Sequence, residues 1–309
     1  MRSRNIRIGT RASPLALWQA NDVRRRLIAA HDLDGEQVEL KTITTTGDTI
    51  QDKALREFGG KGLFSKEIEE ALLAGEIDLA VHSMKDLQTR LPEGLGISCV
   101  LAREDVRDAF LSPKAATLRD LPEGAVVGTS SLRRQAQVKR LRPDLQVATF
   151  RGNVETRLRK LADGVVDATL LALAGLKRLG LEDRITAKMS IEDMLPAVAQ
   201  GAIGVETRRD NDDINHLLAP LNDEVTAICV TAERAFLSEL DGSCRTPIAG
   251  LGELEGDKLH FQGMILRPDG SEWHATERTG GAEDAVAMGT DAARELLGRV
   301  APGFFEDAG

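Results

Sequence analysis

Cysteine is scarce in this chain of 309 residues, which has three, at positions 99, 229 and 244. An odd count without a Cys-x-x-Cys pair argues against a disulfide framework, and the five histidines show no metal-ligand spacing. Long apolar runs are also missing, so we expect no membrane-spanning segment. The N-terminus MRSRNIRIGT lacks the apolar stretch of a signal peptide, and we therefore expect a cytoplasmic protein.

An excess of positive charge is missing as well. The formal net charge is −9, which argues against nucleic acid as a partner, because that binding depends on Lys and Arg neutralising phosphates. Any basic residues that matter must therefore act locally. What is present, 42% hydrophobic and 29% charged residues, is typical of a soluble globular protein, and the length predicts two or three domains.

Short apolar runs alternate with amphipathic helical patterns over the first two-thirds of the chain, which is typical of parallel βα units. Ser13 and Pro14 form a good N-cap and first helical position for a helix over 14–30. Ser65 can cap a helix over 66–74 that Gly75 ends. The expected strands are 5–10, 38–44, 77–83, 125–131, 145–150 and 166–173.

The pattern changes from residue 222 onward. A helix is expected over 222–240, followed by a three-stranded antiparallel meander that turns at EGDK and RPDG. A last helix over 282–300 closes this part of the chain. The sequence therefore predicts a smaller α+β domain after the α/β region.

Cations follow five of the expected strands. In parallel α/β sheets, ligands bind beyond the carboxyl ends of the strands, and cations at helix N-termini are disfavoured unless an anion compensates. The pattern therefore predicts a cleft for a ligand that carries several carboxylates or phosphates. The residues concerned are Arg11, Lys85, Asp86, Thr129, Ser130, Ser131, Arg133, Arg134, Arg151, Arg157, Lys177 and Arg178.

Each of these residues also has a simpler interpretation. An arginine near the start of a helix is usually a solvated surface residue, and the hydroxyls of GTSS can be mere helix caps. Asp86 can end a strand, or it can stay ionised among cations and stabilise a developing positive charge. The glycine-rich segment 47–62 fits a mobile flap or a plain surface loop, and GGKGLF does not match a nucleotide P-loop.

The three cysteines differ in their surroundings. Cys99 lies in the apolar run LGISCVLA, and Cys229 falls on the apolar stripe of its expected helix, so both are predicted to be core residues. Cys244 alone lies in a loop, DGSCRTPIAG, in a setting where a thiolate could form. From these residues alone, the loop thiol is either reactive or incidental.

Several long motifs follow one another along nearly the whole chain, including GGKGLFSKEIEEALL, DLAVHSMKDL, VGTSSLRRQAQ and GSCRTPIAG. In these motifs and in their order, the chain resembles the porphobilinogen deaminase (hydroxymethylbilane synthase) family of tetrapyrrole synthesis. The resemblance implies a transferase that condenses four porphobilinogen molecules head to tail into hydroxymethylbilane and releases ammonia each time. It also implies a covalent dipyrromethane primer, a monomer, and porphobilinogen and its polypyrrole intermediates as the binding partners.

The resemblance implies roles for individual residues. Cys244 matches the thioether anchor of the dipyrromethane, although Ser243 stands where the family usually has glycine, and Asp86 matches the catalytic aspartate that stabilises cationic intermediates. Asp86 is also the first candidate for the group that removes the pyrrole α-proton. The positions that match cofactor-binding residues are Lys85, Thr129, Ser130, Arg133 and Arg134, and those that match substrate-binding residues are Arg11, Arg151, Arg157 and Arg178.

The fold implied by the resemblance is a pair of α/β lobes like those of periplasmic binding proteins, with a third, smaller α+β domain that carries the cysteine. We expect the first domain to contain residues 1–102 and 200–220, the second 103–199 and the third 221–309. The main alternative function is a non-catalytic cytoplasmic anion-binding module with a two-lobed cleft. That alternative explains the arginines but leaves Cys244 and the third domain without a role.

Overall fold

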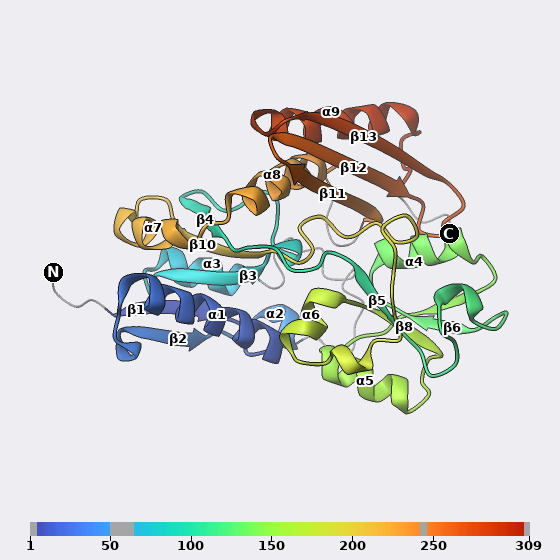
Figure 1. The fold of residues 1–309 in the computed structure, drawn as a ribbon, viewed down its shortest axis with the longest axis horizontal. Coiled ribbons are helices and arrows are strands. Elements are labelled where there is room, and N and C mark those ends of the chain that lie inside the picture. The colour runs from blue at the N-terminus through green and yellow to red at the C-terminus, as the bar shows by residue number, and fades with distance from the viewer. Residues whose placement is uncertain (1–4, 50–64, 242–245, 306–309) are drawn as a thin grey trace. The chain divides into compact units, whose positions relative to one another are not determined.

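The computed structural model describes residues 5–49, 65–241 and 246–305. The chain packs as two compact units, the first formed by Met1–Arg103 with Ala202–Ala227 and the second by Glu104–Gly201 with Ile228–Gly309. The described residues form three sheets, one in the first unit and two in the second (Figure 1). The division into three domains at the residues expected from the sequence stays a prediction.

The first unit is built on a five-stranded sheet with the order β2-β1-β3-β10-β4. Strands β1, β2 and β3 are parallel, whereas β10 runs antiparallel to both of its neighbours. The strands are β1 (Ile6–Thr10), β2 (Val38–Thr42), β3 (Leu79–Ser83), β4 (Leu95–Val100) and β10 (Ile203–Arg208). The helices are α1 (Pro14–His31), α2 (Thr46–Thr49), α3 (Lys66–Leu73) and α7 (Asp212–Leu218).

The second unit contains a sheet with the equivalent order, β7-β6-β8-β5-β9. Here β6, β7 and β8 are parallel, and β5 is antiparallel to its neighbours. The strands are β5 (Asp108–Leu111), β6 (Val126–Gly128), β7 (Gln146–Ala148), β8 (Ala168–Ala172) and β9 (Ala187–Lys188). The helices are α4 (Leu132–Leu141), α5 (Val154–Ala162) and α6 (Leu173–Arg178).

The antiparallel strands reveal how the chain passes between the two α/β lobes. β5 is the first strand after the chain leaves the first lobe, and β10 is the first strand after it returns. Each lobe therefore receives its antiparallel strand at a crossing, and the expected pair of α/β lobes is confirmed. The prediction of parallel βα units is correct for the three parallel strands of each lobe, and it missed β4, β5, β9 and β10.

The third sheet is the predicted antiparallel meander, β11-β12-β13, and helix α9 runs along it (Figure 1). Its elements are α8 (Glu224–Glu239), β11 (Ile248–Glu255), β12 (Lys258–Leu266), β13 (Trp273–Gly281) and α9 (Ala285–Arg299). Alternate residues of β11 and β12 pack on Phe236 of α8, where Gly263 leaves room for the ring. The opposite face packs through Leu251 and Met264 against Ala136 of α4, so β11 and β12 are packed on both faces.

Some of the helix caps predicted from the sequence are present in the structure. Ser13 caps α1 as predicted, since its hydroxyl accepts a hydrogen bond from the amide of Ala16, and Gly75 takes a left-handed φ of 69° just after α3. Ser65 precedes α3, but its side chain makes no capping hydrogen bond, so that detail of the prediction is wrong. No helix within the described ranges is long and apolar enough to cross a membrane.

Candidate functional site

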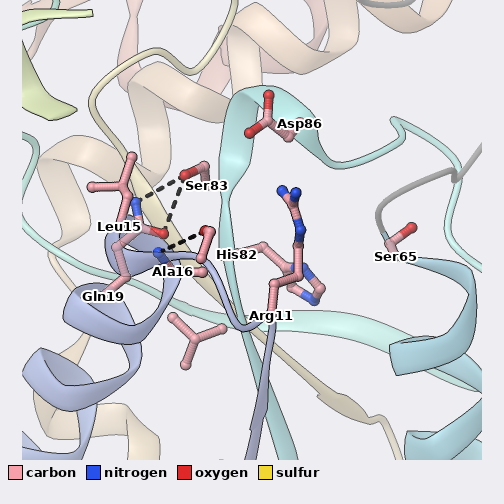
Figure 2. A pocket seen from close by; sticks show the side chains of 10 residues that line it. Arg11, Leu15, Ala16, Gln19, Ser65, His82, Ser83 and Asp86 are labelled. Atoms are coloured by element: carbon pink, nitrogen blue, oxygen red, sulfur yellow. Dashed lines mark hydrogen bonds between the residues drawn. The ribbon is translucent and has the colours of Figure 1, made fainter. Parts of the chain in front are cut away.

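A pocket opens in the first unit at the carboxyl ends of the parallel strands β1 and β3. Arg11 follows β1 directly, and Asp86 lies in the single helical turn Met84–Asp86 that follows β3. Because β1 and β3 are neighbours, these two turns meet at the same edge of the sheet. Figure 2 shows the guanidinium of Arg11 extended toward the exposed carboxylate of Asp86. The structure thus brings together two residues that the sequence singled out.

The wall of this pocket is formed by the start of α1 and the end of β3. Gln19 of α1 is buried, and its amide brackets the hydroxyl of Ser83, donating from Nε2 at 2.8 Å and accepting at Oε1 at 3.1 Å (Figure 2). This pair ties α1 to β3 and fixes the turn that carries Asp86. Neither Gln19 nor Ser83 was among the predicted site residues.

The floor of the pocket contains His82 of β3. Its Nε2 lies 3.0 Å from Oε2 of Glu206 on β10, and the two side chains are 7% and 0% exposed. Glu69 of α3 is buried nearby, and burial raises the pKa of its carboxyl. Sequence analysis did not select these residues, although DLAVHSMKDL places His82 four residues before Asp86.

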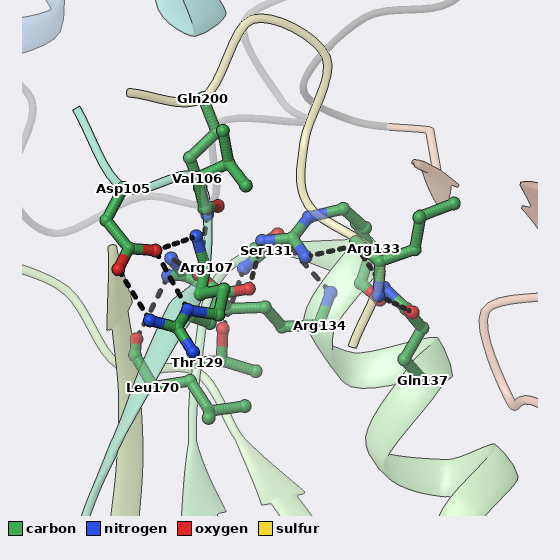
Figure 3. Close-up of polar contacts among 12 residues, drawn as sticks. Asp105, Val106, Arg107, Thr129, Ser131, Arg133, Arg134, Gln137, Leu170 and Gln200 are labelled. Carbon is green, nitrogen blue, oxygen red and sulfur yellow. Dashed lines mark hydrogen bonds and ion pairs between the residues drawn. The ribbon is translucent and has the colours of Figure 1, made fainter. Parts of the chain in front are cut away.

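A second polar centre, in the other unit, is organised by a buried carboxylate on β5. Asp108 accepts hydrogen bonds from Arg133 Nη2 at 2.7 Å and from Arg134 Nη2 at 2.7 Å, and Arg134 Nε adds a third at 3.2 Å. Gln200 Nε2 donates a further hydrogen bond to Asp108 at 3.0 Å. Figure 3 shows both arginines reaching from the first turn of α4 toward β5. The two arginines are therefore not solvated surface residues.

The charges of this centre do not cancel. Asp108 is fully buried, and although burial opposes its ionisation, Arg133 and Arg134 outweigh that effect and hold the pKa of the carboxyl well below its usual range. Two guanidinium groups face one carboxylate, which leaves a net positive charge. Arg133 Nε is buried and lacks a hydrogen-bond partner within the described part of the chain. Among the described residues, the centre therefore keeps one unused hydrogen-bond donor and one excess positive charge.

The hydroxyls of GTSS mainly order the turn between β6 and α4. Ser131 caps α4 by accepting a hydrogen bond from the amide of Arg134, and Thr129 Oγ1 accepts one from the amide of Ser131 at 3.1 Å. Ser130 Oγ donates to the carbonyl of Phe150 at 3.0 Å and accepts from its amide at 3.1 Å. These contacts are those of caps and turns, and they hold the arginines of α4 in place.

The remaining predicted cations are distributed over both units. Lys85 lies in the turn before Asp86 in the first unit, and Arg151 precedes α5 in the second. Arg157 Nε donates to the carbonyl of Gly152 at 2.8 Å, and Arg178 Nη2 donates to that of Gly201 at 2.7 Å. Lys177 donates to Oε1 of Glu104 at 2.7 Å. All five are partly buried, and each makes polar contacts within the protein. Cys244 lies outside the described residues.

The cysteines that are described behave as core residues, as predicted. Cys99 of β4 is 1% exposed and Cys229 of α8 is 4% exposed. Burial raises the pKa of the Cys99 thiol to about 12, so it stays protonated at neutral pH. No group of His, Cys, Asp and Glu side chains within residues 5–49, 65–241 and 246–305 could hold a metal ion.

Comparison with protein families gives two adjacent matches. The family model described as porphobilinogen deaminase, dipyromethane cofactor binding domain, matches residues 6–216. The model described as porphobilinogen deaminase, C-terminal domain, matches residues 227–298. Together they extend over both α/β lobes and the smaller domain.

Curated relatives are similar over almost the full chain. A porphobilinogen deaminase of Nitrobacter hamburgensis is 59% identical over 298 residues, covering 96% of this chain and 94% of the relative. One of Paracoccus denitrificans is 60% identical over 301 residues, covering 97% and 96%. Among solved structures, a putative methionine-binding lipoprotein of Bacillus subtilis matches 72% of this chain and 91% of its own at 11% identity, with a TM-score of 0.46.

Proposed function

Because the chain belongs to the porphobilinogen deaminase family, we propose that it condenses four porphobilinogen molecules head to tail into hydroxymethylbilane and releases one ammonia at each step. The observation that carries this proposal is the match to the family along almost the entire length, together with Arg11 and Asp86 in one pocket at the strand ends. A monomeric state and a cytoplasmic location are part of the proposal and rest on the sequence.

Arg11 and Asp86 divide the work in the pocket of the first unit. Porphobilinogen carries two carboxylate arms, and a planar guanidinium can bind a carboxylate through two parallel hydrogen bonds. When the aminomethyl group leaves as ammonia, the pyrrole becomes an azafulvenium cation. The fixed carboxylate of Asp86 stabilises that cation and accepts hydrogen bonds from pyrrole N–H groups. We therefore assign substrate binding to Arg11 and catalysis to Asp86.

The arginine centre of the second unit fits the carboxylates of a dipyrromethane. Its net positive charge and the unpartnered Nε of Arg133 leave one donor and one charge for an incoming anion. We propose that Arg133 and Arg134 bind cofactor carboxylates and that the turn at Thr129 and Ser130 holds them in place. Lys85 of the first unit is assigned to cofactor binding because it matches one of the family's cofactor-binding positions. When bound, the dipyrromethane supplies the pyrrole α-carbon to which the first substrate is joined.

Cys244 is proposed as the covalent anchor of that dipyrromethane. The family match over 227–298 includes this residue, and the two other cysteines are buried in β4 and α8. A thioether needs an accessible sulfur, which a buried thiol of high pKa does not provide. Arg151, Arg157 and Arg178 are assigned to the carboxylates of the growing chain because of their match to the family's substrate-binding positions.

The test of this function is incubation of the purified protein with porphobilinogen, with ammonia and products measured together. We expect one ammonia for each porphobilinogen consumed and a product that cyclises to a porphyrinogen without further enzyme. Asp86→Ala should abolish both signals. A protein that binds porphobilinogen and returns it unchanged would instead be a non-catalytic anion-binding module, and the proposal would be wrong.

A further inference from the structure

The floor of the pocket in the first unit contains an ionisable cluster that the proposed function does not use. It consists of His82 of β3, Glu206 of β10 and Glu69 of α3, and we call it the His82 cluster. All three side chains are buried, and His82 also lines the pocket in which Arg11 and Asp86 lie. Figure 2 shows the imidazole beneath the side chain of Arg11.

The strand register accounts for the contact between His82 and Glu206. Gly204 of β10 lies opposite His82 of β3, and Glu206 is two residues further along, so its side chain points to the same face. Glycine has no side chain, and the imidazole therefore reaches the diagonal neighbour. Its Nε2 lies 3.0 Å from Oε2 of Glu206. In the described part of the chain, no hydrogen bond occupies the other ring nitrogen, Nδ1.

Glu206 is a buried carboxylate directly behind the imidazole of His82. Both of its carboxylate oxygens are buried and lack an aligned hydrogen bond from any described residue, so the 3.0 Å contact is an ion-pair distance without hydrogen-bond alignment. A fully buried carboxylate is costly unless a charged partner compensates it. The imidazole of His82 is the group placed to compensate Glu206 once it takes up a proton.

The other charged groups around the imidazole do not compete for this role. Burial, and secondarily the nearby Glu206, raise the pKa of the Glu69 carboxyl, which favours its neutral form compared with an exposed glutamate. Arg11 enters from the turn after β1 and Asp86 from the turn after β3, and both lie on the pocket side. Glu206 is thus the carboxylate placed behind the imidazole, away from the substrate.

We propose that His82 accepts the proton that each condensation step releases, and that Glu206 is the positioning residue behind it. This inference rests on the proposed function. The C–H bond at the free α-carbon of the terminal pyrrole breaks, its electron pair returns to the pyrrole ring, and the proton joins Nδ1 of His82. The proton then leaves with the released ammonia as ammonium. Glu206 holds the Nε2–H and stabilises the imidazolium, which is the role of the carboxylate in catalytic triads.

A separate proton acceptor solves a chemical conflict in the pocket. The C–C bond consumes the azafulvenium cation before the α-proton leaves, so an Asp86 that took this proton would have to release it again before it could stabilise the next cation. With His82 as the acceptor, Asp86 stays ionised through the cycle. General base catalysis of this kind typically contributes a factor of about 100 or more to the rate.

The first test is spectroscopic and does not depend on turnover. We would record nitrogen NMR spectra of the full-length protein with labelled histidine, and His82→Gln would identify the His82 signals. We expect the neutral imidazole to carry its proton on Nε2, and the population of this tautomer to fall in Glu206→Gln. A proton on Nδ1 in the wild type, or an unchanged tautomer in Glu206→Gln, would overturn the proposal.

The second test is kinetic. His82→Gln should lower kcat by about 100-fold and leave KM within a few-fold, and porphobilinogen deuterated at its free α-carbon should then react more slowly than the unlabelled substrate. His216→Gln is the matched control, since His216 lies in the same unit, is exposed and forms a hydrogen bond between Nδ1 and the carbonyl of Asp212 at 2.7 Å on its own helix.

The kinetic outcomes separate the two proposals. A His82→Gln protein that keeps its thermal midpoint and a kcat within a few-fold of wild type would refute the role of His82. A wild-type protein that releases no ammonia would refute the proposed function instead. If His82→Gln does not fold, substituting the other four histidines one at a time identifies the His82 signals by elimination. The tautomer measured in the wild type and in Glu206→Gln then still decides whether His82 can accept a proton at Nδ1.

Discussion

Replacing Asp108 with asparagine should destabilise the second unit strongly. The substitution keeps the shape of the side chain and removes the only negative charge that directly contacts the buried guanidinium groups of Arg133 and Arg134 in the described structure. The carboxylate is 0% exposed, and the arginines are 4% and 7% exposed, so water cannot replace the lost partner.

The expected size follows from the geometry. Asp108 accepts three hydrogen bonds from the two arginines, at 2.7, 2.7 and 3.2 Å. Asparagine has a single acceptor oxygen and no negative charge, so it cannot replace these interactions. Removing one partner from a buried ion pair typically costs about 3–5 kcal/mol, because the remaining charge is left uncompensated. We therefore expect Asp108→Asn to lower the free energy of unfolding by about 3–5 kcal/mol.

The same carboxyl predicts a dependence on pH. The pKa of Asp108 is lowered in the folded protein, so its contribution to stability is present above the ordinary aspartate pKa of about 3.9 and is lost as the pH falls toward the lowered value. Stability of the wild type should therefore decline below about pH 4, and Asp108→Asn should decline less steeply over the same range.

Urea unfolding followed by far-ultraviolet circular dichroism measures both effects. The matched control is Asp193→Asn, which removes the partner of Arg119 from an exposed pair in the same unit and should leave the midpoint almost unchanged. A loss of less than about 1 kcal/mol in Asp108→Asn, or a pH profile identical to that of the wild type, would refute the reasoning about this centre.

Four further predictions concern other parts of the chain. Gly289→Ala should lower the free energy of unfolding by about 1–3 kcal/mol, because a Cβ at this position would lie 2.1 Å from the carbonyl oxygen of Ala232. A Cβ at Gly298 in the same helix would meet nothing within 4 Å, so Gly298→Ala should leave stability unchanged or raise it when both variants are compared by urea unfolding. Cys99 should resist alkylation by iodoacetamide at pH 8 in the native protein, since burial raises its pKa to about 12, and rapid labelling by mass spectrometry would contradict this. Asp86→Ala should remove turnover with an unchanged thermal midpoint, and turnover within a few-fold of wild type would contradict its assignment. Arg11→Ala should retain the attached cofactor and raise KM for porphobilinogen, and loss of the cofactor would show that its role is different.

The parallel strands and their helices could be predicted from the sequence, because apolar runs followed by capped amphipathic helices are local signals. Ser13 and Pro14 at the start of α1 are an example, and the meander after α8 is another. The antiparallel strands β5 and β10 could not be predicted in the same way. Their pairing depends on segments far apart in the chain, since β10 lies between β3 and β4.

Site residues could be predicted where a charged side chain directly follows a predicted strand. Arg11 and Asp86 follow strands directly, and parallel strands bring such turns together. Asp108 and Glu206 were missed, since each is a single carboxylate inside an apolar strand and its importance appears only when distant partners reach it. The sequence predicted that Arg133 and Arg134 need an anionic partner. Asp108 of the same unit provides one of the two negative charges that would balance them.

The intact mass of the denatured protein, compared with that of Cys244→Ser, tests the central claim most directly. The wild type should be heavier than its sequence by two condensed pyrrole units, either as purified or after incubation with porphobilinogen, and Cys244→Ser should show no such excess. A wild type without the excess in either condition, or an equal excess in the variant, would contradict a dipyrromethane held through Cys244.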